Sequence, residues 1–282
     1  MIPLKNSRQE RRALAGVALI AAMVLALYAY MGTDIYRPFQ FSKANGDYYP
    51  LLVDGFRHGS LALAAEPPAA LAQLSDPYDP VQREKAGIEV KHDVSYYHGR
   101  YYLYFGVAPA VTFFWPFRVL TGVHFPQSLA TVLFCAGGYL CNLALVLSLR
   151  RRYFSGTRTV WLWLGSLMLG LANFCPGMLA RNSIWEVPIA CAYFYSSLGL
   201  LLLFHSYHAK HSRALWLAAT GTACGLSIAS RPHFLLFCVA LGIWWLCDRL
   251  RSFRSEAASP RADWIRETVA LFFCPSPSSS PD

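Results

Sequence analysis

The feature that most constrains this chain is an uninterrupted apolar run from Ala13 to Met31. A helix over this run is long enough to cross the roughly 30 Å hydrocarbon core of a bilayer. One lysine and three arginines precede it in residues 1–12, and basic flanks of this kind stay on the cytoplasmic side of a membrane. Since no small-residue cleavage site follows, we expect a retained signal anchor: a cytoplasmic N-terminus at 1–12 and a first transmembrane helix at 13–31.

Composition places the whole chain among multi-pass membrane proteins. Of its 282 residues, 55% are hydrophobic and only 15% are charged, which is too apolar for an ordinary soluble domain. The net charge of +9 does not indicate nucleic acid, because the basic residues cluster in short segments between apolar runs and accompany no known binding motif. We therefore expect a membrane lipid environment and no nucleic-acid partner.

Later apolar runs predict a bundle of five helices over residues 126–248, with spans at about 126–149, 159–179, 184–205, 213–229 and 232–248. The predicted fold is an all-α polytopic membrane protein with about six transmembrane helices. This layout puts the basic segments at the ends of the second, fourth and sixth spans inside the cell, as expected for cytoplasmic loops. We expect both termini in the cytoplasm and a bacterial-type inner (plasma) membrane.

The segment 104–121 decides the topology. It is about long enough to span, but Pro109 and Pro116 interrupt it and Arg118 closes it. If it spanned, the arginines at 150–152 would fall outside, so we expect it to lie flat at the interface. A second interfacial helix is expected from Gly46 to Gly59, where apolar residues recur at helical spacing. Both belong to a long extracytoplasmic loop, residues 32–125.

Residues 249–282 form a polar tail, expected in the cytoplasm. An apolar run, VALFFC, begins within it, but PSPSSSPD follows at once. Two interpretations are open: a disordered terminus, or a truncated chain whose next span is missing. We favour truncation.

The stretch from Asp93 to Arg118 is the most informative part of the loop. It packs four tyrosines around Arg100 before it enters aromatic, apolar sequence. Tyrosine favours the boundary between water and lipid, and an arginine can grip a phosphate or carboxylate with two parallel donors. The stretch predicts either a polar site at the membrane surface or an aromatic belt with a snorkelling arginine.

Other ionisable residues lie at the predicted outer ends of spans. Arg181 and Glu186 flank the fourth span and Arg231 begins the sixth. A charge at membrane depth needs water, a partner or a ligand, so Arg181 and Glu186 either pair with each other or serve the function. Asp76 and Asp79, in SDPYDP, are more typical of turns than of catalysis.

The order of these features resembles the C-type membrane glycosyltransferases, the group that includes protein O-mannosyltransferases and aminoarabinose transferases. GDYYPLLVDGFRHGSL looks like the segment after the first span that carries the catalytic acid in that group. YYHGRYYLYFGVAPAVTFFWPF is similar to the later aromatic helix, preceded by a basic residue that meets the donor phosphate. The adjacent acid pair usual in the group is absent, because Gly46 precedes Asp47.

The resemblance implies transfer of a sugar from a polyprenyl-phosphate donor to an extracytoplasmic acceptor. Asp47 or Asp93 would be the catalytic base, and Arg100, with Arg231, would contact the phosphate. We expect no nucleotide, while a divalent metal and the oligomeric state stay open. The residues expected to bind the lipid-linked sugar are Tyr96, Tyr97, Arg100, Tyr101, Tyr102, Arg181, Glu186 and Arg231.

Two other classes of function stay open from the sequence. A lipid carrier or transporter would use the same arginines without a base, but its ionisable groups are expected in mid-span rather than at span ends. A non-catalytic or truncated relative would act as a structural membrane subunit and need no chemistry.

Overall fold

The computed structural model describes residues 7–33, 41, 47–181, 184–209 and 212–255. The chain forms two compact units, a helical unit of 1–41 with 128–282 and a loop unit of 42–127. The described residues are mostly helical (73%), as the sequence predicts. The polar tail expected at 249–282 lies outside the described residues from 256 onward, and so do the first six residues.

Five helical segments are long and apolar enough to cross a membrane, namely Arg8–Met31, Gln127–Tyr153, Thr159–Arg181, Glu186–His208 and Pro232–Leu250. They confirm five of the six predicted spans as candidates. The helices are α1 (Ser7–Met31), α5 (Gln127–Tyr153), α6 (Thr159–Leu171), α7 (Cys175–Arg181), α8 (Glu186–His208), α9 (Arg213–Ser230) and α10 (Leu235–Ser255), which the short η3 (Pro232–Phe234) precedes.

The remaining predicted span, the fifth in chain order at about 213–229, coincides with α9, which is not among those five segments. Its sequence, RALWLAATGTACGLSIAS, mixes threonine, serine and glycine with apolar residues, and this lowers its hydropathy. It packs along α8, where the Ser196 and Ser227 hydroxyls lie 2.7 Å apart. The count of six spans stays a prediction.

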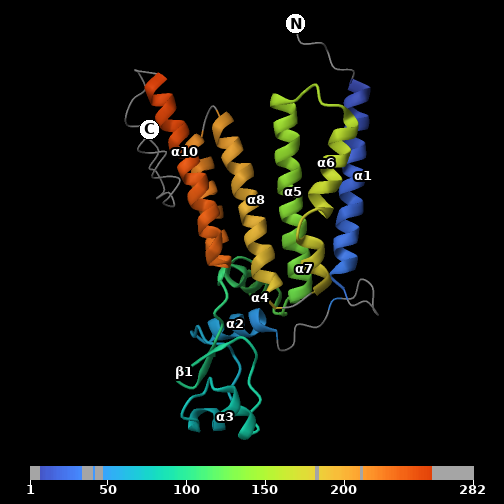
Figure 1. The fold of residues 1–282 in the computed structure, drawn as a ribbon. Coiled ribbons are helices and arrows are strands. Elements are labelled where there is room, and N and C mark those ends of the chain that lie inside the picture. Colours follow the sequence, from blue (N-terminus) through green and yellow to red (C-terminus); the bar gives the residue numbers. More distant parts are fainter. Residues whose placement is uncertain (1–6, 34–40, 42–46, 182–183, 210–211, 256–282) are drawn as a thin grey trace. The chain divides into compact units, whose positions relative to one another are not determined.

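Consecutive long helices of the helical unit run in opposite directions (Figure 1). The start of α1 therefore shares one end of this unit with the ends of α5, α8 and α10 and with the start of α9. We call this the basic end, because it carries Arg8, Arg11, Arg12, Arg150, Arg151, Arg152, Arg213 and Arg249. Such a one-sided distribution is typical of cytoplasmic helix ends.

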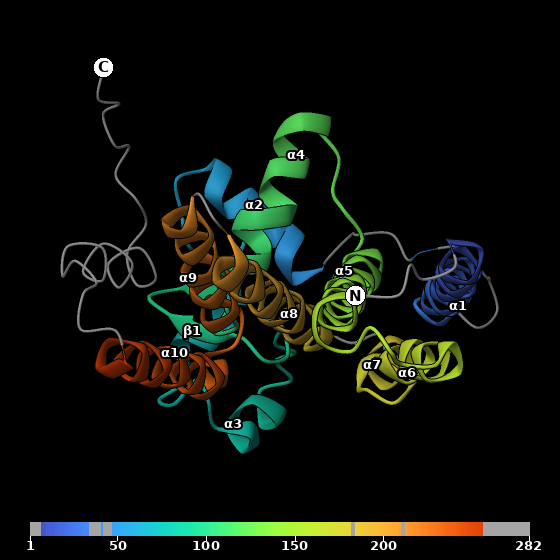
Figure 2. The same cartoon turned by 90° about the horizontal axis from the view of Figure 1, so that it is seen from above.

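Small residues and a few polar contacts bring the spans together, as in other membrane bundles. Seen from above in Figure 2, α6 and α7 lie between α5 and α1. Gly170 allows close approach of α1, because a Cβ there would come within 2.6 Å of Val24. Tyr28 also donates a hydrogen bond to the Gly170 carbonyl (2.6 Å). Between α5 and α8, Asn142 donates to the Tyr193 hydroxyl (3.1 Å).

The loop unit is built around α2 (Tyr48–Arg57). Its buried face meets a π-helical turn, η2 (Ala110–Phe114), and the following α4 (Trp115–Thr121). The rings of Tyr49 and Phe114 stack with centroids 5.2 Å apart, and Phe56 meets Trp115 edge to face at 5.9 Å. Both helices expected in this loop therefore form, although the second begins only at Ala110. That they lie at the interface stays a prediction.

Two short elements and a hairpin complete the loop unit. They are η1 (Ala69–Gln73), α3 (Pro80–Lys85), β1 (Ser95–Tyr97) and β2 (Arg100–Tyr102). As expected for turn residues, the Asp76 carboxylate accepts from the Tyr78 N–H and the Asp79 carboxylate caps α3 through the Val81 N–H, both at 2.8 Å.

The antiparallel hairpin corrects the all-α prediction. Tyr97 pairs with Arg100 across a two-residue turn, in which His98 and Gly99 both have positive φ (45° and 72°). Such turns match the twist of a hairpin and favour glycine. The signal was present in the sequence as HG between two tyrosine pairs.

Candidate functional site

Asp47 directly precedes α2, in the position where an acidic side chain usually caps the helix. Its carboxylate makes no such cap. Gln127 takes that role instead, because its Oε1 accepts from the Tyr49 N–H at 3.3 Å. The Asp47 carboxylate instead faces the Gln127 N–H, with Oδ2 3.5 Å away. The Asp47 carboxylate therefore does not cap α2, although its position would normally give it that role.

Burial raises the pKa of the Asp47 carboxyl above its ordinary value, while the Gln127 N–H and the charge of Lys91 act in the opposite direction. A carboxylate whose pKa is raised binds a proton more readily and is a better general base near neutral pH. The local environment of Asp47 is therefore suited to proton transfer.

Tyr48 links Asp47 to the segment that holds Asp93. Its hydroxyl donates to the His92 carbonyl (2.5 Å), and the Lys91 ammonium lies 4.9 Å from the centre of its ring. Burial raises the pKa of Tyr48, and the negative charge of Asp93 adds to this effect. Asp93 has a positive φ of 51° and approaches His92 at 3.6 Å. We call Asp47, Tyr48, Lys91 and Asp93 the acidic cluster; Tyr48 and Lys91 are the members that the sequence did not predict.

Arg100 lies elsewhere in the loop unit. Its Nη1 donates a long hydrogen bond (3.5 Å) to the Ser60 hydroxyl, and both line a groove of about 690 Å³ that also has His58 and Glu66 in its wall. The side chain of Arg100 is exposed. The groove offers a cation, an acid and one hydroxyl group to a polar ligand.

The two sites occupy opposite ends of α2. Asp47 stands before its first residue, whereas the Ser60 N–H bonds to the carbonyl of Gly55 near its end (3.0 Å). Ten helical residues rise about 15 Å. The structure thus brings Asp47 and Asp93 to one cluster, whereas Arg100 contacts Ser60 at the end of α2 opposite Asp47.

The four predicted tyrosines divide by exposure. Tyr97 is 63% exposed and could present a ring face to a ligand, whereas Tyr101 is buried (3% exposed). Its ring packs edge to face on Tyr96 (6.1 Å), and Tyr102 lies edge to face with Tyr97 (6.5 Å). Of the four, Tyr97 offers the largest free surface, and Tyr101 serves packing.

In the helical unit, the structure gathers the three other predicted residues around Trp185. Arg181 lies over the Trp185 ring (5.0 Å) and pairs with Glu186 (3.5 Å), while Arg231 donates to the Trp185 carbonyl (3.1 Å). The pairing of Arg181 with Glu186 is therefore confirmed. Glu186 is buried (4% exposed), and its Oε2 accepts no hydrogen bond from the described residues. This Trp185 cluster lies at the end of the unit opposite the basic end.

A further ionic cluster was not predicted. Asp54, in α2, pairs with His124 (2.8 Å) and with Arg118 of α4 (3.5 Å). Its partners come from residues more than sixty positions later, so local spacing holds no signal for them. We infer that these ion pairs hold α2 against the segment around α4.

Among the described residues, no group of three histidine, cysteine, aspartate or glutamate side chains is placed to hold a metal ion. Comparison with models of known protein families, with curated proteins and with solved structures finds no match for this chain.

Proposed function

We propose that this chain is a membrane glycosyltransferase that moves a sugar from a polyprenyl phosphate to an extracytoplasmic acceptor. The observation that carries the proposal is the carboxylate of Asp47. This carboxylate is half-buried and its pKa is raised. It does not cap α2, because Gln127 accepts the hydrogen bond from the Tyr49 N–H instead. The resemblance in sequence supplies the class of reaction, and this carboxylate supplies a base with a suitable environment.

In the proposed reaction, Asp47 takes the proton of the acceptor hydroxyl while the acceptor oxygen attacks the anomeric carbon of the donor sugar. The bond between that carbon and the phosphate oxygen breaks, and its electron pair leaves with polyprenyl phosphate. Asp93 is the alternative base, because it shares the acidic cluster. Lys91, close enough to lower the pKa of Asp47, can stabilise charge on the leaving phosphate.

Arg100 receives a different role from the one the sequence predicted. Since it lies at the far end of α2, we assign it to ligand binding in the groove beside Ser60. A phosphate or a sugar hydroxyl could be held there by the planar guanidinium. Tyr97 pairs with Arg100 in the hairpin and offers an exposed ring nearby.

A lipid carrier is the second candidate, favoured by the Trp185 cluster with its two arginines. Its charged residues lie at helix ends, at the last residue of α7, at the start of α8 and just after α9. A carrier that moves a charged lipid across the bilayer is expected to place such groups in mid-span. The placement therefore supports the transferase over the carrier.

The direct test uses purified protein in lipid nanodiscs with a radiolabelled sugar on polyprenyl phosphate. We expect release of free polyprenyl phosphate and no consumption of nucleotide sugars. Turnover of a nucleotide sugar without lipid would rule out the proposed donor. Movement of the intact lipid between leaflets, with no bond cleaved, would favour the carrier.

We also propose that the loop unit rests on the outer membrane surface and that both termini are cytoplasmic. Support comes from apolar side chains that recur at every fourth position along η2 and α4. Residues four apart share one face of a helix, and this face is exposed. Its members are Val111, Trp115 and Val119.

Single cysteines in a cysteine-free background test this topology. Cysteines at Ser60 and Ser95 should react with a membrane-impermeant thiol reagent in intact cells. Cysteines at Ser155 and Ser212 should react only after the membrane is opened, because the basic end would be cytoplasmic. Labelling of Ser155 from outside would mean that residues 104–121 span the membrane.

A further inference from the structure

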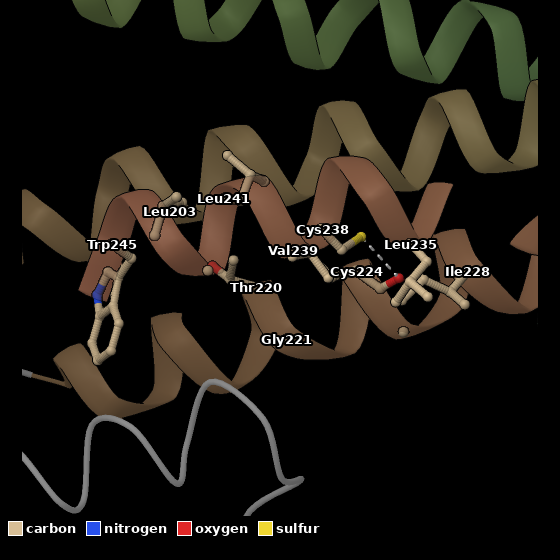
Figure 3. A pocket seen from close by; sticks show the side chains of 12 residues that line it. Leu203, Thr220, Gly221, Cys224, Ile228, Leu235, Cys238, Val239, Leu241 and Trp245 are labelled. Carbon is tan, nitrogen blue, oxygen red and sulfur yellow. Dashed lines mark hydrogen bonds between the residues drawn. The ribbon is translucent and has the colours of Figure 1, made fainter. Parts of the chain in front are cut away.

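Two cysteines of the helical unit meet near the turn from α9 into α10. The thiol of Cys238, in α10, donates a hydrogen bond to the carbonyl of Cys224, in α9 (3.6 Å), and Figure 3 shows this contact as a dashed line. The two thiols also hydrogen-bond to each other. Both are free thiols. We call Cys224 and Cys238 the α9–α10 thiol pair.

Contact between two thiols is the first requirement for a disulfide. The Cβ atoms of a disulfide lie about 3.8 Å apart, and cysteines whose side chains point away from each other cannot be joined unless the backbone moves. Here the thiols already meet, and the short η3 directly connects the two helices that carry them. The thiol pair is therefore placed to form a bond with little rearrangement.

The thiol pair is also within reach of a small oxidant. Neither cysteine is fully buried, and both line a cavity of about 240 Å³ that has no charged side chain in its wall. A second pair of hydrogen-bonded thiols, Cys135 and Cys175, is only 0% and 1% exposed. Since reaction of a thiol requires access, the two pairs are expected to differ, and only the α9–α10 thiol pair should react readily.

The position of the thiol pair matches an oxidising compartment. Cys224 stands six residues before Ser230, the last residue of α9, which corresponds to a rise of about 9 Å. Cys238 lies in the first turn of α10. This end of the unit is opposite the basic end. In the topology proposed above it faces the extracytoplasmic side, where disulfides form and persist.

We propose that Cys224 and Cys238 are a redox-active pair, which an organic disulfide converts into an intramolecular disulfide between α9 and α10. One cysteine loses its proton and attacks a sulfur of the organic disulfide, whose S–S bond breaks. The first leaving thiol takes up that proton. The other cysteine then attacks the mixed disulfide, and its proton goes to the second leaving thiol. Two electrons pass from the cysteines to the organic disulfide.

The disulfide would restrain the turn that carries Arg231, whose guanidinium donates to the Trp185 carbonyl (3.1 Å). A cross-link restricts the open states of the segment that it closes. Hydrogen exchange of residues 225–237 is therefore expected to slow about tenfold on oxidation and to recover when the protein is reduced. This inference goes beyond the proposed function and does not depend on sugar transfer.

The test treats the full chain, in phosphatidylcholine nanodiscs, with dithiodipyridine, a small organic disulfide that enters membranes. Remaining thiols are then alkylated, and mass spectrometry of proteolytic peptides maps the disulfides. We expect a link between Cys224 and Cys238, whereas the exposed Cys247 of α10 should keep a single pyridylthio group. Cys135 and Cys175 should stay reduced until the protein is unfolded, because both are buried.

Cys224→Ser and Cys238→Ser should each abolish the link and leave a pyridylthio group on the cysteine that remains. The control Cys141→Ser removes a partly exposed thiol of α5 and should leave the link unchanged. If a serine variant fails to fold, the map of the wild-type protein still decides.

Three results would overturn the proposal: stable pyridylthio groups on both Cys224 and Cys238 of one molecule, no reaction at either, or a link from either to a third cysteine. A link that leaves the hydrogen exchange of residues 225–237 unchanged would overturn the predicted restraint of the turn.

Discussion

Asp47→Asn is expected to reduce sugar transfer about a hundredfold to ten-thousandfold, the usual contribution of a general base. The amide keeps the size of the side chain but cannot accept the acceptor's proton. Donor binding, measured by cross-linking or by equilibrium binding in nanodiscs, should stay near the wild-type value. Loss of binding together with turnover would indicate a structural acid instead.

The pH dependence of the sugar-transfer rate should also show that Asp47 acts as the base. Because burial raises the pKa of Asp47, its base form should be lost on acidification at a higher pH than the ordinary aspartate value of about 3.9. The acidic limb of the rate profile is therefore expected above that value in the wild type and absent from the residual rate of Asp47→Asn.

Asp79→Asn is the matched control for this prediction. It makes the same change on a second acid of the same unit, whose carboxylate caps α3. Turnover should stay within about twofold of the wild-type rate, since the asparagine Oδ1 can still accept from the Val81 N–H and cap α3. Asp93→Asn tests the second candidate base. Near-normal turnover in both Asp47→Asn and Asp93→Asn would leave the mechanism without a base.

Gly55→Ala is expected to destabilise the loop unit by about 3 kcal/mol, at the upper end of the usual cost of overpacking. A Cβ at Gly55 would stand 2.0 Å from the Ala62 carbonyl oxygen, and backbone cannot move aside cheaply. The change should also disturb the Arg100 groove, because Gly55 lines it and binds the Ser60 N–H. Hydrogen exchange of residues 47–127 in the intact protein measures the effect.

Gly165→Ala provides the comparison. This glycine also lies within a helix, but a Cβ there meets nothing within 4 Å. We expect no loss of protection, and even a gain of about 0.5–1 kcal/mol from the better helix former. Equal protection in Gly55→Ala and the wild type would show that residues 55 and 62 do not pack as closely as described.

Secondary structure in the loop unit was only partly predictable. The pattern from Gly46 to Gly59 indicated a helix, and α2 occupies Tyr48–Arg57, because its apolar periodicity is a local property. The sequence did not predict the hairpin at Ser95–Tyr102, although HG between tyrosine pairs is a recognisable turn signal. The tyrosines there suit a membrane interface as well as a strand, so their residue type alone does not distinguish the two.

What the sequence by itself determined is the membrane character of the chain and the position of its long helices. A bilayer offers no hydrogen bonds to backbone groups, so a long apolar run has few alternatives to a helix. Only the tertiary structure decided the site. Gln127 caps α2, Lys91 approaches Asp47, and Arg100 contacts Ser60. Each of these contacts joins residues tens of positions apart in the chain. Those contacts follow from packing, which local periodicity does not encode.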